Sequence, residues 1–207
     1  MTKRFRIILI ITAIVLVSVM STAIGLTAAI WDSASGGSSE YGPVVDAVNW
    51  NTWEKYFIYE NASDGNSKAV IGYTGTNLGD VIFPVAGTGE LPIRTIKNTV
   101  FDDTTLKELP ITIYISPTIS TIEAGAFANL PNLQTVVFGI METDDGQVIK
   151  QTVNVGAYAF AGCQNLKSIV IEGSRTVNFD TTAFVGCYNL TSITKNGVEQ
   201  DKSGYII

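Results

Sequence analysis

Residues 156–171 read GAYAFAGCQNLKSIVI, and the chain repeats this pattern 24 residues later. Four residue pairs recur in the same register, namely Ala159-Phe160 with Ala183-Phe184, Gly162-Cys163 with Gly186-Cys187, Asn165-Leu166 with Asn189-Leu190, and Ser168-Ile169 with Ser192-Ile193. Two earlier stretches follow the template less closely, and all four carry an anchoring phenylalanine, at Phe101, Phe127, Phe160 and Phe184. The spacings between these anchors are 26, 33 and 24 residues. Repeats of this period predict a solenoid of stacked coils.

Each coil is expected to contribute apolar side chains to two ladders that line the interior. The residue five places before each anchor is apolar and predicts one inner ladder, made of Ile96, Ile122, Val155 and Phe179. The Leu-x-x-Ile/Val segment after the anchor predicts a second ladder, and Ala-Phe-x-Gly-Cys predicts a single helical turn between them. The 33-residue coil carries about nine extra residues within 139–151, which we interpret as an outward β-hairpin.

The repeat resembles the BspA-type leucine-rich repeat, whose units read roughly I-x-x-x-A-F-x-G-C followed by x-N-L-x-x-I-x-I. The resemblance extends from Tyr56 to the C-terminus, although Asn129-Leu130 and Asp103-Thr104 replace the Gly-Cys pair in the two earlier units. It implies an α/β fold class: a leucine-rich-repeat-like right-handed solenoid of about four coils, mostly β with single helical turns, capped by an N-terminal β-hairpin. It also implies a surface interaction module without enzymatic activity.

Five segments are predicted from composition and pattern. Residues 1–32 form a signal peptide or N-terminal membrane anchor, and the small polar residues 33–43 form a flexible linker. Residues 44–92 form an N-terminal cap that includes a hairpin of 56–59 with 69–73. Residues 93–194 form the solenoid with its inserted hairpin at 139–151, and residues 195–207 form a C-terminal cap.

The N-terminal segment is predicted to address a membrane. Lys3, Arg4 and Arg6 precede an apolar stretch at 7–30, so the positive-inside rule places the N-terminus inside and the rest of the chain outside. The stretch is long enough to span a bilayer and remain as an anchor, and the small residues in its C-terminal half suit cleavage by signal peptidase near Ala29. Both alternatives make the domain extracytoplasmic, either secreted or on the cell surface.

The end of this segment also resembles the signal sequences of camelysin-like secreted proteins. Residues 25–32 read GLTAAIWD, and the family pattern is G-x-T-x-A-[aromatic]-F-T-D. This second resemblance supports export of the chain.

Composition excludes several classes of function. The chain has no histidine, which removes the residue best suited to proton transfer near neutral pH. Three of its 13 basic residues lie in the first 29 positions, which leaves 10 against 19 acidic residues, a net charge of −9. Nucleic acid is therefore not an expected partner. Two cysteines without histidine are too few for a structural zinc site, and no cofactor is predicted.

The paired acids and the two cysteines have structural explanations. Asp102-Asp103 follow an anchor where a turn should begin, so capping explains them better than catalysis or calcium binding. Asp144-Asp145 lie in the predicted turn of the insertion. Cys163 and Cys187 occupy identical positions in adjacent coils, where a disulfide is within reach, but their parallel side chains favour buried free thiols. No catalytic or metal-ligating residue is predicted.

Three functions are open at this stage. The first is a non-enzymatic surface module that binds a protein or the extracellular matrix, as the family resemblance implies. The second is a structural subunit of an extracellular layer or filament, and the third is a glycan-binding protein. The residues expected to contact a partner lie in the insertion and in the N-terminal cap, and are Ile140, Met141, Glu142, Asp144, Asp145, Val148, Trp50 and Trp53.

Overall fold

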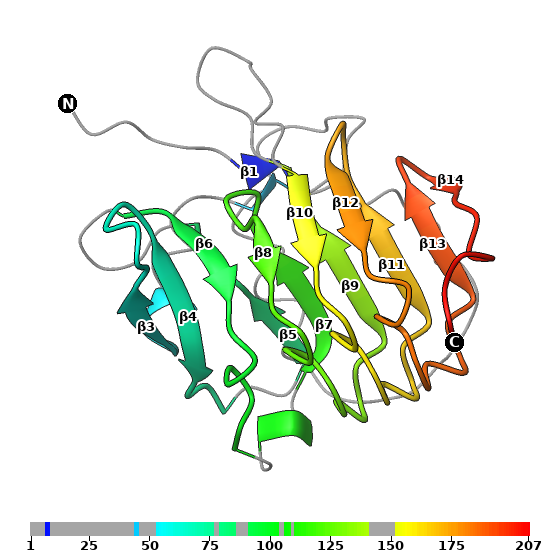
Figure 1. Cartoon of the computed structure of the whole chain (residues 1–207), viewed down its shortest axis with the longest axis horizontal. Coiled ribbons are helices and arrows are strands. Elements are labelled where there is room, and N and C mark those ends of the chain that lie inside the picture. The colour runs from blue at the N-terminus through cyan, green and yellow to red at the C-terminus, as the bar shows by residue number, and fades with distance from the viewer. Residues whose placement is uncertain are drawn as a thin grey trace.

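The computed structural model describes residues 53–76, 79–85, 91–103, 106–108, 110–140 and 152–207, and two short strands at 7–8 and 44–45. It contains two six-stranded sheets, one behind the other in Figure 1. The first sheet has the order β12 (Thr176–Phe179), β10 (Thr152–Val155), β8 (Thr121–Ile122), β6 (Ile93–Ile96), β4 (Lys68–Tyr73) and β3 (Phe57–Asn61). The second has the order β14 (Val198–Glu199), β13 (Ser192–Lys195), β11 (Ser168–Ile171), β9 (Thr135–Phe138), β7 (Pro110–Ile115) and β5 (Gly79–Ile82).

The chain alternates between the two sheets, so each coil gives one strand to each. All neighbours within a sheet are parallel except the terminal pairs β3–β4 and β13–β14, which are antiparallel. The predicted β solenoid with an N-terminal hairpin is therefore confirmed. The expected ladder is also present, since Ile96, Ile122, Val155 and Phe179 are matched across neighbouring strands.

The described residues form five coils, one more than the anchoring phenylalanines predicted. The additional coil is β4 with β5, which the sequence analysis assigned to the cap. Tyr73 takes the place of the phenylalanine in this coil. The pair Asn77-Leu78 follows it after four residues, where the last three coils have five, and the apolar residues Val81 and Phe83 come next in the sequence. This shortened copy of the template was the available signal, and the missing phenylalanine concealed it.

The expected helical turn is a series of tight turns. Ala161 N–H donates to Tyr158 and Cys163 N–H to Phe160, each three residues back, and the described part of the coils contains no α-helix. The only 3-10 helix with bounds in the described residues is η1 (Leu106–Glu108). The turns also bond between coils, as Phe127 N–H donates to the carbonyl of Ala159 at 2.8 Å. These lateral bonds replace the ones that a helix would make within itself.

A left-handed residue ends each of these turns. Gly162 and Gly186 have φ of 73° and 78°, and Asn129 occupies the same place with φ of 58°. Glycine adopts this conformation freely and asparagine is among the few other residues that tolerate it. The replacement of Gly-Cys by Asn129-Leu130 therefore preserves the backbone of the turn.

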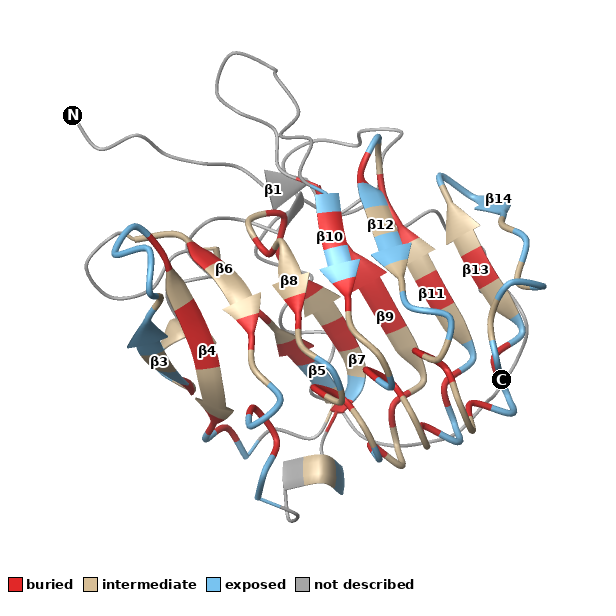
Figure 2. Ribbon diagram, in the orientation of Figure 1, coloured by how far each residue is buried: buried red, intermediate tan, exposed pale blue. Residues whose placement is uncertain are grey.

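Aromatic rings fill the core along its whole length. Phe127, Phe160 and Phe184 are fully buried, and successive ring centroids lie 5.3 and 5.7 Å apart. Phe101 and Tyr73 continue this stack toward the N-terminus, with Phe101 6.2 Å from Phe127 and Tyr73 5.6 Å from Phe101. Figure 2 shows the buried residues following the strands of both sheets. The repeat spacing thus aligns one anchor per coil.

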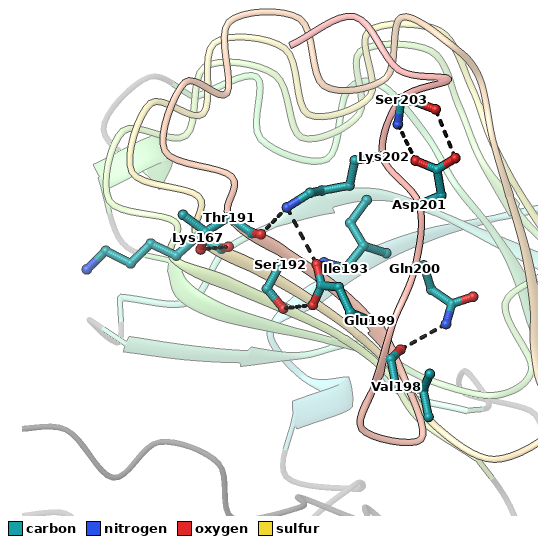
Figure 3. A network of polar contacts seen from close by, with 10 residues as sticks. All are labelled: Lys167, Thr191, Ser192, Ile193, Val198, Glu199, Gln200, Asp201, Lys202 and Ser203. Atoms are coloured by element: carbon teal, nitrogen blue, oxygen red, sulfur yellow. Dashed lines mark hydrogen bonds and ion pairs between the residues drawn. The ribbon is translucent and has the colours of Figure 1, made fainter.

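The C-terminal segment closes the second sheet (Figure 3). β14 folds back on β13 through Asn196 and Gly197, whose positive φ values of 51° and 76° suit a two-residue hairpin. The Glu199 carboxylate accepts the Ile193 N–H at 3.2 Å and the Ser192 hydroxyl at 3.1 Å. A side chain therefore occupies a ladder donor that a further parallel strand would otherwise use.

The N-terminal predictions fall largely outside the described residues. β1 (Ile7–Ile8) and β2 (Val44–Val45) pair antiparallel with each other, and the rest of segments 1–32 and 33–43 is not described. In the part of the chain that is described, no helix is both long and apolar enough to cross a membrane. The signal peptide, the anchor and the linker stay predictions.

Candidate partner-binding surface

The predicted insertion joins the two sheets on one side of the solenoid. β9 ends at Phe138 and β10 begins at Thr152, so residues 139–151 form this connection. The equivalent connections are shorter, at 116–120 between β7 and β8, at 172–175 between β11 and β12, and at 83–92 between β5 and β6. Of the predicted contact residues here, Met141, Glu142, Asp144, Asp145 and Val148 lie outside the described residues.

Ile140 belongs to the core and not to the contact surface on which the sequence analysis placed it. Only 5% of its surface is exposed. It packs tightly against Gly173, where an added Cβ would lie 2.6 Å from Ile140 Cγ2, and Gly173 has φ of 58°. Its physical role is therefore to fix the first end of the insertion against the next coil.

A buried arginine, which the sequence analysis did not single out, binds the base of the insertion. Arg175 lies in the connection between β11 and β12 and is 1% exposed. One terminal nitrogen of its guanidinium, Nη1, donates to the carbonyls of Ile115 at 3.0 Å and Gly139 at 2.8 Å. The other, Nη2, donates to Ser116 and Ile119, both at 2.9 Å. One side chain thus joins three successive connections between the sheets.

Electrostatics favour the charged form of Arg175 despite its burial. Burial lowers the pKa of the guanidinium to about 9, and the nearby Glu172 carboxylate acts in the opposite direction. Four carbonyl dipoles point at the cation, and its carbon lies 5.7 Å from the centroid of the Phe138 ring. The side chain is therefore a cation at neutral pH, and it serves as a hydrogen-bonding hub for backbone.

The outward face of β10 and β12, at one end of the first sheet, is polar and uncharged. Asn154 and Asn178 are neighbours in register, and Asn178 Nδ2 donates to Asn154 Oδ1 at 3.0 Å. Thr152 and Thr176 form a second exposed pair beside them. Farther along, Lys97 lies 2.9 Å from Glu123, and the hydrogen bond to Glu123 raises the pKa of this lysine. This face offers amides and hydroxyls to a partner.

The outward face of the second sheet combines a hydroxyl row with an apolar row. Asp80 begins the first row, which continues through Thr112, Thr135, Ser168 and Ser192. Tyr114 lies in the second row, together with Ile82, Val137, Val170 and Thr194. Burial raises the pKa of Asp80, against a hydrogen bond from Thr112, and raises the pKa of Tyr114 to about 12. These two rows can donate and accept hydrogen bonds, and Asp80 is the one carboxylate in them.

The aromatic N-terminal cap is partly packed against the core. Trp53 is half-buried and meets Tyr56 edge-on, with 6.0 Å between ring centroids. The Lys55 ammonium lies 5.0 Å from the centroid of the Tyr56 ring, and the Tyr59 hydroxyl donates to the carbonyl of Glu54. Trp50 lies outside the described residues. The described rings therefore form an edge-to-face cluster and not a flat stacking platform.

The remaining candidates are an exposed pair of acids and two buried cysteines. Asp102 and Asp103 are both exposed, and the described residues contain no group of three or more acids or cysteines placed to hold a metal ion. Cys163 and Cys187 are free and fully buried, and each thiol donates to a carbonyl of the preceding coil at 3.0 Å. Burial raises the pKa of Cys163 to about 12 and that of Cys187 to about 11.

The repeated asparagines form a ladder along the turns. Asn132, Asn165 and Asn189 each donate a side-chain N–H to a carbonyl of the coil before, at 2.6 to 2.8 Å. This bond occupies the amide of Asn189 and explains why the repeat carries asparagine at this place.

Comparison with known proteins agrees with this architecture. The sequence matches one family model, the BspA type leucine rich repeat region in six copies, over residues 74–148 and 144–201. No curated protein is significantly similar in sequence.

Two solved structures are similar in shape. A T. pallidum leucine rich repeat protein is 18% identical with a TM-score of 0.44, covering 67% of this chain and 68% of that one. A leucine rich cell surface protein from Faecalibacterium prausnitzii is 17% identical with a TM-score of 0.41, covering 68% of this chain and 53% of that one. The family match spans more than half of the chain and begins within its first coil.

Proposed function

Because the chain belongs to the BspA-type leucine-rich repeat family, we propose that it is a non-enzymatic protein-interaction module of the bacterial cell surface. The predicted export segment supports the extracytoplasmic location, and the acidic balance of the exported part supports a basic protein or matrix component as partner. Solenoids bind through side chains that repeat along their length, or through a segment that breaks the repeat. The longest such break between the two sheets is at residues 139–151.

The observation that carries the proposal is the fixed base of residues 141–151. Gly139 is bound by Arg175 at 2.8 Å and Ile140 is packed in the core, while Thr152 begins β10 on the other side. A loop with anchored ends loses less conformational freedom when it binds, which favours affinity. We therefore place the partner contact on Met141, Glu142, Asp144, Asp145 and Val148, with Trp50 and Trp53 of the cap as a second contact region.

The test compares two matched pairs of acids. Asp144 and Asp145 are replaced together by asparagine in the full-length chain, and Asp102 and Asp103, the other adjacent acid pair, are replaced in the control. Adhesion of cells displaying each variant is measured on surfaces coated with individual matrix proteins, at low and at high salt. The proposal expects weaker adhesion and a smaller salt dependence for the first variant alone.

A shortened variant tests the apolar contribution. Residues 142–150 are replaced by a two-residue turn, while Gly139 and Ile140 are kept because they contact Arg175 and the core. If a variant with an unchanged melting temperature adheres as the natural chain does, the contact lies elsewhere. Loss of adhesion on substitution of Trp50 and Trp53 would then assign it to the aromatic cap and favour the glycan-binding alternative.

A further inference from the structure

The two sheets end differently at the C-terminal end of the solenoid. The second sheet is closed by β14 and by the Glu199 carboxylate. The first sheet ends at β12, with no further strand beyond it in the described residues (Figure 1). Natural proteins protect edge strands with charges, proline or a covering segment, because an open edge is a template for another strand. Thr176–Phe179 carries neither a charge nor proline.

The hydrogen bonds identify which backbone groups face the open edge. Asp180 N–H donates to the carbonyl of Val155, so Asp180 and, by alternation, Asn178 face β10. Val177 and Phe179 therefore direct their N–H and C=O groups away from β10. Thr181 lies on the same edge, and its carbonyl accepts the N–H of Ile206 at 2.8 Å. The C-terminal segment thus pairs with the end of this edge and leaves its middle unpaired within the described residues.

We propose that β12 pairs antiparallel with β12 of a second copy of the chain. A two-fold axis beside Asn178 brings Val177 opposite Phe179 of the other copy, and this pair exchanges two backbone hydrogen bonds. The symmetric pair on the other side of the axis exchanges two more. All four unpaired donors and acceptors of Val177 and Phe179 are used once in each copy. The two first sheets then become one continuous twelve-stranded sheet.

The side chains favour this occupant over an unrelated strand. The axis places Asn178 opposite its own counterpart, and Asn178 already donates to Asn154 at 3.0 Å. Its amide retains a second N–H and its carbonyl oxygen, so the two copies of Asn178 can bond to each other and continue the amide row across the interface. In this register Thr176 faces Asp180 of the other copy, so no like charges meet. Self-complementarity of this kind is what a two-fold interface requires.

Continuous stacking of coils is disfavoured by the opposite end of the molecule. There the first sheet is terminated by β3, which is antiparallel to β4 and exposes Ile58 and Glu60. A copy added head to tail would therefore not meet a parallel coil. The pairing instead closes after two copies, and the dimer would present two partner-contact regions and gain avidity.

A cysteine placed on the axis tests the pairing in the full-length chain. Asn178→Cys puts two thiols in a non-hydrogen-bonded antiparallel pair, where a disulfide is readily formed. Asn154→Cys is the matched control, because Asn154 is also exposed and lies in the same row one strand farther from the edge. Both variants are oxidised in bacterial membranes or in mild detergent and separated without reductant. We expect at least fivefold more dimer for Asn178→Cys, while equal amounts would overturn the proposal.

A second variant separates edge pairing from chance collision. Val177→Pro removes an N–H that faces the edge, without touching the bonds between β12 and β10. Combined with Asn178→Cys, it should return the dimer to the level of the Asn154→Cys control, with a melting temperature close to that of the parent. An undiminished dimer in the folded double variant would refute pairing through β12. If Val177→Pro does not fold, the comparison of the two cysteine variants still decides.

Discussion

Replacement of Arg175 by alanine should destabilise the fold more than any surface substitution. The change removes the four hydrogen bonds that the guanidinium donates to the carbonyls of Ile115, Ser116, Ile119 and Gly139. All four of these residues are buried. A buried group left without a partner costs about 1 to 3 kcal/mol. The carbonyls of Ile115 and Ser116 keep the backbone N–H groups of Gly139 and Ile119 as donors, so the cost of each lost bond falls at the lower end of this range. The sum of about 4 kcal/mol is reduced by the desolvation of the guanidinium, which is no longer required.

The expected loss of unfolding free energy is therefore about 2 to 4 kcal/mol. In a domain of this size it lowers the melting temperature by roughly 10 °C. The measurement is urea unfolding followed by circular dichroism, with Lys167→Ala as an exposed control. Arg175→Lys should recover only part of the loss, because one ammonium cannot reach four carbonyls as a planar fork does. A loss below about 1 kcal/mol for the alanine variant would mean that water replaces the guanidinium and that the hub is not structural.

Three further predictions concern the repeat itself. Phe160→Ala should cost about 3 to 5 kcal/mol in urea unfolding, because the ring is fully buried between two stacked phenylalanines, and a loss under about 1 kcal/mol would contradict that packing. The Cys163 and Cys187 pKa values are raised in the folded state, so their protonated thiols support folding below about pH 8.5, and stability falls as the pH rises toward 11 and 12. Native protein at pH 8 should resist alkylation that modifies both thiols in urea, and rapid native labelling would disprove their burial. Asn165→Ala should cost about 0.5 to 1.5 kcal/mol through its bond to the Pro131 carbonyl, and a neutral result would remove the ladder from the stabilising contacts.

The parts of the fold that repeat were predictable because they depend on spacing alone. Phe127, Phe160 and Phe184 stack where their common register placed them, and residues 139–151 connect β9 with β10 where the excess length was assigned. The tight turns that replace the expected helical turn could not be predicted from the sequence of one coil. The backbone groups of these turns bond to the adjacent coil, as the Gly162 N–H does to the Val185 carbonyl at 2.8 Å. These bonds between coils form only once the coils have stacked.

The base of the candidate site could not be predicted, since its chemistry depends on residues far apart in the chain. Arg175 follows Glu172, Gly173 and Ser174 in a stretch that reads as an exposed polar loop. Its four partners lie 36 to 60 residues earlier. Only the folded chain shows that the carbonyls of three connections converge on one point, and that an arginine is long enough and planar enough to serve all of them.

The Arg175 hydrogen bonds also connect coils that are not neighbours in the solenoid. In a regular solenoid each coil contacts only its neighbours, so stability is close to a sum of local terms. Arg175, at the start of the fifth coil, binds Ile115 at the end of the second coil and Gly139 at the end of the third. The longest insertion of the repeat therefore starts at the point where coils that are not adjacent are joined. Arg175 therefore adds contacts between coils that are not neighbours, which a regular solenoid lacks.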